Sequence, residues 1–184
     1  MEDIKVKKLD IGCGISKREG YTGVDILDLP GVDIKHDLNK FPYPFKDNEI
    51  DEVWMDQLLE HLNEPMKAME EIYRICKSGA MVYVGVPYFR SFYAVIDPTH
   101  KNFIGVYWFD YFDPDTDINK KYRYTEAKFK VEKIEFDREY RNTRVKLLHR
   151  LMIKIANRKP KPYEERLSHL YPLNSLTFYL KVIK

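Results

Sequence analysis

The N-terminal region joins a predicted β-strand directly to a pair of glycines, and this junction limits the folds open to the chain. Residues 5–11 have the β-branched and apolar character of a strand, and the strand runs straight into Gly12 and Gly14. Residues 21–26 form a second predicted strand, with Asp25 near its end. Glycine lets a ligand approach the backbone because no Cβ intervenes, and an acid on the neighbouring strand is placed to accept both hydroxyls of a ribose. The pattern predicts an adenosine-containing cofactor at the carboxyl edge of a parallel sheet.

The rest of the chain alternates predicted strands and helices, which is typical of an α/β sheet. Helical spacing predicts one helix from Asn63 to Ser78-Gly79 and an amphipathic helix around residues 145–155, before the last strand. The further predicted strands cover residues 32–34, 50–55, 80–86, 129–136 and 175–183.

The first crossover connections are unusually short. Parallel strands usually need a dozen or more residues between them. Only residues 12–20 separate the first two strands and only residues 27–31 separate the next two, so there is room for one or two helical turns and then for none. We therefore expect the third strand to be vestigial or to pair unusually.

Length and composition favour one globular domain over residues 1–184. Lysine and arginine total 31 against 29 acids, a near balance that does not indicate a nucleic-acid binder. Two cysteines cannot form a zinc quartet and favour a reducing compartment. The sequence shows no export signal and no run of the ~18 apolar residues that a membrane span needs, so a cytoplasmic location is expected.

The charge beside the glycines distinguishes between adenosine-containing cofactors. A dinucleotide requires a third glycine and a full helix facing its pyrophosphate, and neither follows Gly14. Asp25 follows Gly14 by 11 residues, well short of the ~20 of the dinucleotide fingerprint. Asp10 lies two residues before Gly12, where its charge repels phosphate and suits a cation such as an α-amino group beside a sulfonium. These features favour S-adenosylmethionine over NAD.

With these residues the chain resembles the class I S-adenosylmethionine-dependent methyltransferases, specifically the small methyltransferase type 11-like group with a shortened first half. The likeness is firm over residues 4–87 and looser in the remainder. The matching stretches are Leu9-Asp-Ile-Gly-Cys-Gly14, Gly23-Val-Asp-Ile26, His36-Asp-Leu-Asn-Lys-Phe-Pro-Tyr-Pro-Phe45, Ile50-Asp-Glu-Val-Trp54, Leu58-Leu-Glu-His-Leu62 and Ile72-Tyr-Arg-Ile-Cys-Lys-Ser-Gly79.

The resemblance implies a Rossmann-like, doubly wound and mostly parallel sheet of order 3-2-1-4-5-7-6, with the last strand antiparallel and the first half shortened. It also implies the residues that bind S-adenosylmethionine. Asp10, Gly12 and Gly14 are expected to bind the methionine part, and Cys13 is a small filler of the turn. Asp25 is expected to bind the ribose, while Ile26, Asp37 and Leu38 contact the adenine. The methyl donor is expected to be lined by Met55, Asp56 and Gln57.

Methyl transfer requires little of the protein beyond aligning the acceptor with the methyl group and the sulfur of the donor. Methyl transfer from a sulfonium is an in-line displacement with an already activated donor. A base is needed only where the acceptor is a weakly acidic hydroxyl or a protonated amine. His61 and His100 are the catalytic candidates because histidine titrates near neutral pH, although His61 also fits a packing role near a helix end. No metal site is predicted.

Two segments of the second half are candidates for binding an acceptor or a partner. Residues 88–125 are expected to form a substrate lid or insertion, although their aromatics equally suit a satellite hydrophobic cluster. The run from Arg141 to Lys161 holds eight basic residues and no acid, and is expected to be a basic amphipathic helix. It is either a solvated helix face or a site for an anionic partner such as a phosphorylated glycan or a membrane surface. The aromatics of the first segment are residues 88, 89, 92, 93, 103, 107, 108, 109, 111 and 112.

The sequence thus predicts methyl transfer from S-adenosylmethionine to a small molecule or to a glycan or lipid intermediate. An RNA or protein methyltransferase guided by the basic segment is the alternative within enzymes, and nucleic acid is the less favoured partner because no RNA-binding module accompanies it. A non-catalytic nucleoside-binding interaction module of the same fold is the alternative from another class. The shortened first crossover favours this last interpretation.

Overall fold

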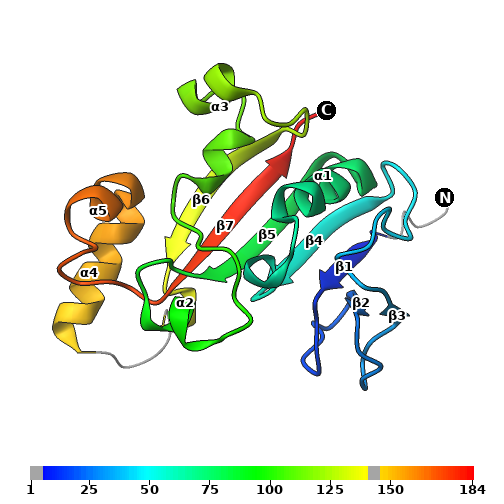
Figure 1. Cartoon of the computed structure of the whole chain (residues 1–184), viewed down its shortest axis with the longest axis horizontal. Helices are drawn as coiled ribbons and strands as arrows, with labels where there is room; N and C mark the ends of the chain where they lie inside the picture. The colour runs from blue at the N-terminus through cyan, green and yellow to red at the C-terminus, as the bar shows by residue number, and fades with distance from the viewer. Residues whose placement is uncertain (1–5, 141–145) are drawn as a thin grey trace.

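A seven-stranded sheet forms the centre of the structure, which is a computed structural model that describes residues 6–140 and 146–184. Its order is β3-β2-β1-β4-β5-β7-β6 (Figure 1). Neighbouring strands are parallel except where β7 pairs with β5 and β6. The predicted sheet order and antiparallel last strand are confirmed. The strands are β1 Lys8–Ile11, β2 Thr22–Asp25, β3 Ile34–Lys35, β4 Ile50–Asp56, β5 Cys76–Pro87, β6 Phe129–Phe136 and β7 Ser175–Val182.

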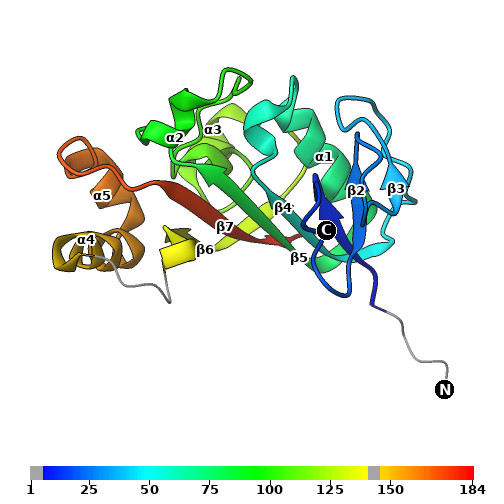
Figure 2. The same cartoon turned by 90° about the horizontal axis from the view of Figure 1, so that it is seen from below.

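The helices gather on one side of the sheet and beyond its β6 edge (Figure 2). They are α1 Pro65–Ile75, α2 Phe92–Ile96, α3 Asp117–Tyr122, α4 Leu147–Arg158 and α5 Pro160–Arg166, with the 3-10 turns η1 Leu59–His61, η2 Trp108–Tyr111 and η3 Arg138–Tyr140. Among the described residues, no helix is long and apolar enough to span a bilayer.

The short crossovers explain why the helices are unevenly placed. The strand order reverses at β1, so right-handed connections to its two sides pass over opposite faces of the sheet. Residues 12–21 and 26–33, which lead from β1 to β2 and from β2 to β3, contain turns and no helix. The face that they would cover therefore carries no helix within the described parts of the chain. The expectation of a vestigial third strand is confirmed, because β3 has two residues and pairs parallel to β2.

Aromatic and cationic side chains cover this open face instead. Trp54, Tyr83 and Tyr179 lie opposite one another on β4, β5 and β7. The Trp54 and Tyr83 rings stack with their centroids 4.6 Å apart. The guanidinium groups of Arg18 and Arg138 lie 3.7 Å and 4.7 Å from the centroid of the Trp54 ring. These two arginines shield Trp54 where a crossover helix is missing, and Trp54 is only 8% exposed.

The opposite face of the sheet is apolar and packs against α1. Helical spacing brings Met69, Ile72 and Ile75 of α1 to the sheet, and all three are fully buried. The sheet contributes the buried side chains of Leu9, Ile11, Val53, Met55, Val82 and Val84. The main hydrophobic core therefore lies between α1 and the first five strands in the chain.

The prediction that Ser78-Gly79 ends the first helix is wrong. α1 ends at Ile75, and β5 begins at the next residue and runs through both of these positions. Cys76 has extended backbone, and it pairs with Ile50 of β4. The helix thus passes directly into a strand, because the sheet supplies pairing partners before the glycine is reached.

Residues 88–125 contribute both core and surface. Tyr88, Phe109 and Phe112 are fully buried, and Phe109 packs against Phe178 of β7 with ring centroids 4.7 Å apart. In contrast, α2 is largely exposed, since only Ala94 of its five residues is buried. The buried aromatics around η2 therefore belong to the main hydrophobic core rather than to a satellite cluster, while α2 leaves apolar side chains at the surface.

The basic segment contains two helices rather than one. α4 ends at Arg158 and α5 begins at Pro160, because proline cannot continue a helix but suits its first turn. Residues 141–145, which include the first two basic residues of the run, lie outside the described residues. α4 packs through Ala156 near its C-terminal end, whereas Leu148 and Leu151 are at least half exposed.

Candidate cofactor and acceptor site

The carboxyl ends of β1 and β2 and the loops after β3 and β4 enclose a cavity, which we call the nucleoside pocket. It brings together five of the residues predicted to bind the cofactor. Three lining residues, Asn39, Leu58 and Leu62, were not predicted from the sequence. Asn39 belongs to the loop after β3, and the other two belong to the loop after β4. The lining is Gly12, Asp25, Ile26, Asp37, Leu38, Asn39, Leu58, His61 and Leu62.

Asp25 occupies the end of β2 with its carboxylate held by two backbone amides. The amide of Gly14 donates to Oδ2 at 2.9 Å and that of Leu27 donates to Oδ1 at 3.0 Å. A carboxylate offers about four acceptor positions, so each oxygen retains one. These two remaining positions match the two hydroxyls of a ribose. The side chain is therefore both oriented and free to accept from a nucleoside.

Asp37 lies across the same pocket and is oriented in the same way. Its Oδ1 accepts from the amide of Asn39 at 3.0 Å. Leu38 beside it is buried, whereas Ile26 on the β2 side is 52% exposed. One acid with two apolar side chains fits an adenine ring and its exocyclic amine. The residues present thus fit the adenosine part of S-adenosylmethionine.

Gly12 needs both its conformation and its small size. Its φ is +72°, in the left-handed region that glycine favours, and its amide donates to the carbonyl of Val24 at 2.7 Å. An added Cβ would lie 3.0 Å from a methyl carbon of Leu58. Close packing of β1 against the loop after β4 therefore depends on glycine here.

Replacing Gly12 with alanine is expected to lower the free energy of unfolding by about 2 kcal/mol, of which about 1–2 kcal/mol is backbone strain. The contact with Leu58 adds to the strain and narrows the nucleoside pocket. Urea denaturation measures the stability. Gly20→Ala is the matched control, because Gly20 also has a positive φ, of +80°, but open space around its added Cβ. Equal losses in the two variants would show that Leu58 does not press on this position.

Asp10 points to the open face of the sheet. It is 5% exposed, and its Oδ2 accepts from the amide of Arg18 at 2.7 Å, which fixes the loop after Gly12. Burial is the main cause that raises the pKa of Asp10. The structure thus gives Asp10 a role in holding the glycine loop, close to the end of the site where the methionine part is predicted.

A second cavity, which we call the acceptor pocket, is lined in part by the two residues that precede Leu58 of the nucleoside pocket. It has a volume of about 300 Å³, at the lower end of the range for small-molecule sites. Asp56 and Gln57, both predicted to line the methyl donor, form one wall. The other lining residues are Gly85, Pro87, Tyr93, Arg138, Glu139, Tyr140, Asn174, Ser175, Leu176 and Thr177.

Two arginines hold the carboxylate of Asp56. Its Oδ2 lies 3.2 Å from the guanidinium of Arg138 and 3.4 Å from that of Arg18. Gln57 follows with a positive φ of 53°, and its amide donates to the carbonyl of Gly85 at 2.8 Å. This turn carries the chain from β4 between the two pockets. The arginines were not predicted as site residues, since they come from distant loops.

Two of the predicted cofactor residues, Met55 and Cys13, are buried and line neither pocket. Met55 is fully buried in the hydrophobic core. Cys13 is 8% exposed, and burial is the main cause that raises the pKa of its thiol. Cys13 therefore fills the turn, as expected, and is poorly suited to form a thiolate.

The two candidate histidines lie together beside the nucleoside pocket. The ring centroids of His61 and His100 are 4.7 Å apart. His61 follows β4 in η1, and His100 belongs to the loop after α2. Burial, followed by the nearby His100, lowers the pKa of His61. Glu60 lies next to them and was not singled out by the sequence.

Comparisons with known proteins agree with this geometry. Residues 9–84 match a family model described as a methyltransferase domain. The structure is similar to S-adenosylmethionine-dependent methyltransferases from Archaeoglobus fulgidus (20% identity, 96% of this chain and 86% of that one, TM-score 0.57) and from Mesorhizobium loti (13%, 96% and 90%, 0.56). It is also similar to the cyclase SpnF (17%, 99% and 76%, 0.57). A comparison with curated proteins finds no matching relative.

At these identities the solved structures show the fold, and the family match covers the segment that builds the nucleoside pocket. Together they confirm the resemblance that the sequence motifs indicate. Residues 9–84 therefore match the methyltransferase domain family, and the whole chain has the fold of the solved S-adenosylmethionine-dependent methyltransferases to which it is similar.

Proposed function

We propose that the chain transfers a methyl group from S-adenosylmethionine to a small molecule or to a glycan or lipid intermediate bound in the acceptor pocket. One observation carries this proposal. Asp56 and Gln57 line the acceptor pocket and the next residue, Leu58, lines the nucleoside pocket, so one short turn borders both. A donor and an acceptor bound in the two pockets would meet at this turn.

The protein's contribution in this proposal is orientation. The cofactor supplies an activated methyl group on its sulfonium. Asp25 holds the ribose, and Asp37, Leu38 and Ile26 hold the adenine. The glycine turn with Asp10, Gly12, Cys13 and Gly14, the backbone of Met55, and the side chains of Asp56 and Gln57 position the rest. Alignment of this kind accounts for a large share of the rate where the donor is already activated.

The lining of the acceptor pocket favours a small acceptor with a planar or apolar part and a polar group. Tyr93 and Tyr140 supply aromatic walls, while Arg138 and Asn174 supply donors. Tyr93 comes from α2, whose Phe92, Val95 and Ile96 are each more than half exposed. We propose α2 as the mobile part of a lid formed by residues 88–125, because it lies over the pocket with little burial of its own.

A screen with S-adenosylmethionine labelled in its methyl group tests the proposed function. We expect label in at least one class of small-molecule, glycan or lipid acceptor. Label in RNA or protein alone would overturn the proposed acceptor class. Binding of the cofactor without transfer to any class of acceptor would support the non-catalytic module. The similarity to a protein described as a cyclase is consistent with a use of this fold other than methyl transfer.

Replacing Gly85 with alanine is expected to lower the rate of methyl transfer by about tenfold or more, since small displacements of aligned groups are costly. An added Cβ at Gly85 overlaps Oδ1 of Asp56, so the carboxylate must move away from its two arginines. The initial rate with labelled cofactor and the acceptor found in the screen measures this effect. Gly79→Ala, in the same strand, is the control for a general loss of stability: its φ of +81° strains the backbone, but the added Cβ has open space around it. An unchanged rate in Gly85→Ala would show that Asp56 does not position the reacting groups.

A second candidate function rests on the basic helix. Arg150, Lys154 and Arg158 of α4 are all exposed. We propose that this helix binds an anionic partner, and a steep dependence of RNA retention on salt would favour the RNA methyltransferase. Lack of retention on RNA at low salt would remove that alternative.

A further inference from the structure

One glutamate and two histidines from two separate loops converge beside the nucleoside pocket. Glu60 and His61 belong to η1, directly after β4, and His100 belongs to the loop that follows α2. One ligand atom from each of these residues can be chosen so that all lie within 4.8 Å of one another. His61 also lines the nucleoside pocket, so the cluster borders the site of the cofactor.

Glu60 is buried without a partner for its side chain. It is 1% exposed, and neither carboxylate oxygen has a hydrogen-bond partner in the part of the chain that the structure describes. The position is fixed by its backbone, because the carbonyl of Glu60 accepts from the amides of Lys101 and Asn102 at 2.8 Å and 3.0 Å. A carboxylate held in this way is costly unless a cation or donor reaches it. Burial raises the pKa of Glu60 to about 8.

In both histidines the hydrogen bond is made by Nδ1, and Nε2 of His100 lies 4.0 Å from Oδ2 of Asp97. Nδ1 of His100 lies 3.0 Å from the carbonyl of Ala94, which can only accept, so this nitrogen carries the proton. Nδ1 of His61 lies 2.9 Å from the hydroxyl of Thr99. That hydroxyl donates its hydrogen to Asp97 at 2.7 Å, so it accepts from His61. In the neutral state, both rings therefore retain a lone pair on Nε2.

This is the arrangement that metal-binding histidines adopt. Such histidines typically donate their second ring nitrogen to a carbonyl, a carboxylate or a hydrogen-bonded polar group, which fixes the orientation of the ring. Two neutral imidazoles and one carboxylate are the protein ligands of many catalytic zinc sites and of non-haem iron sites. In these sites the remaining coordination positions stay open to water or substrate.

We propose that Glu60, His61 and His100 bind one divalent transition-metal ion through a carboxylate oxygen and the two Nε2 atoms. The ligand class is a first-row ion that accepts mixed nitrogen and oxygen donors, such as Zn²⁺, Fe²⁺ or Co²⁺. The ion would neutralise the unpartnered carboxylate of Glu60. Its open positions would take water or an oxygen of the acceptor, and this last role rests on the proposed function. The two histidines are then metal ligands rather than bases.

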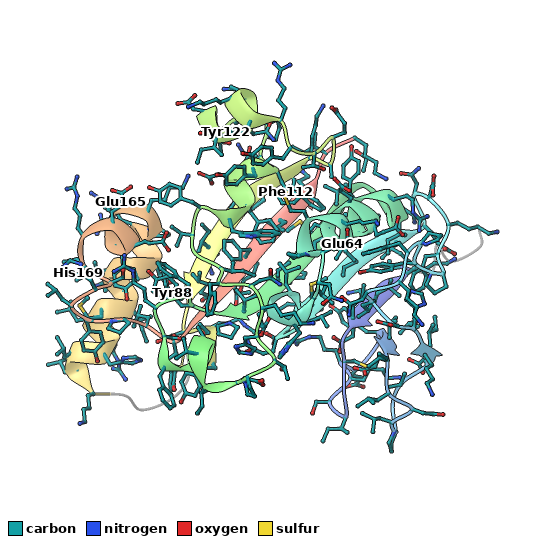
Figure 3. The ribbon with its side chains drawn as sticks, in the orientation of Figure 1. Glu64, Tyr88, Phe112, Tyr122, Glu165 and His169 are labelled. Atoms are coloured by element: carbon teal, nitrogen blue, oxygen red, sulfur yellow. The ribbon has the colours of Figure 1, made fainter. Side chains whose placement is uncertain are left out.

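Titration of the metal-free chain of residues 1–184 with Co²⁺ tests this inference, since cobalt bound by nitrogen and oxygen ligands gives visible absorption bands. We expect one Co²⁺ per chain, displacement of Co²⁺ by Zn²⁺, and a Zn²⁺-dependent rise in melting temperature. Glu60→Gln and His100→Gln should each weaken binding by at least about tenfold. His169→Gln is the control, because His169 is exposed at the end of the molecule that carries α5 (Figure 3).

The variants also distinguish a metal site from a merely structural cluster. Without metal, Glu60→Gln should melt at a temperature close to that of the wild-type chain, because neither side chain has a hydrogen-bond partner for its polar end among residues 6–140 and 146–184. With Zn²⁺ the wild-type chain should melt at the higher temperature. The absence of one-to-one Co²⁺ binding by the wild-type chain would overturn the inference, and so would binding by Glu60→Gln and His100→Gln that is as tight as that of the wild-type chain. Binding of S-adenosylhomocysteine in the same samples shows whether the proposed function survives independently.

Discussion

Replacing Phe109 with alanine is expected to lower the free energy of unfolding by about 3–5 kcal/mol, the usual cost of removing a buried phenylalanine ring. Phe109 is fully buried and packs against Phe112 of its own segment and Phe178 of β7. It is the main link between η2 and the sheet. Urea denaturation followed by circular dichroism measures the change.

The control for this prediction is Phe103→Ala in the same segment. Phe103 is 57% exposed, so its loss should change stability by less than about 1 kcal/mol. A small loss in Phe109→Ala, comparable with that of the control, would contradict the assignment of η2 to the core. It would instead favour the interpretation of the whole segment 88–125 as a lid.

Replacing Asp25 with alanine is expected to weaken the binding of S-adenosylhomocysteine by more than tenfold, or more than about 1.4 kcal/mol. The variant loses the acceptor of the ribose hydroxyls and also releases the amides of Gly14 and Leu27. Titration calorimetry measures the affinity. Asp28→Ala removes an exposed acid from the same loop and should bind as the wild-type chain does.

Asp25→Asn separates the two contributions of this side chain. Asparagine retains one acceptor oxygen for the loop but lacks the charge and the second acceptor oxygen. Weaker binding in both variants, with melting temperatures near that of the wild-type chain, would assign the effect to the nucleoside. Unchanged affinity in Asp25→Ala would mean that the ribose is not bound at the end of β2.

The sheet could be predicted from the sequence because its strands have strong local signals. The run from Phe129 to Phe136 is a strand with the predicted bounds, and the short crossovers after Gly12 and Asp25 already limited helix formation on one side. The predicted end of the first helix was wrong, because the pairing of Cys76 with Ile50, which ends α1, is a tertiary contact. Local glycine signals carry no information about such a partner.

The predicted parts of the site are those that follow directly from strand ends. Gly12, Asp25 and Asp37 lie at or just after the ends of β1, β2 and β3, so the sheet order alone brings them to one edge. The unpredicted parts depend on loops far apart in the chain. Arg138 reaches Asp56 across the sheet, and His100 reaches Glu60 through the loop after α2. No spacing within the sequence indicates either of these two contacts.

The open face has a consequence for how this small domain is stabilised. A doubly wound sheet normally buries both faces beneath helices. Here Trp54 is covered by two arginine side chains, and the pairing of both with Asp56 couples that cover to the wall of the acceptor pocket. The missing helices are thus replaced by contacts that also shape the site.

A crystal structure of the chain in complex with S-adenosylhomocysteine tests the central claim most directly. The account predicts both ribose hydroxyls on the carboxylate of Asp25, with the adenine between Ile26 and Leu38 and the sulfur directed toward Asp56. A nucleoside bound elsewhere, or a pocket between Gly12 and Leu62 that stays closed to it at saturating concentration, would contradict the account.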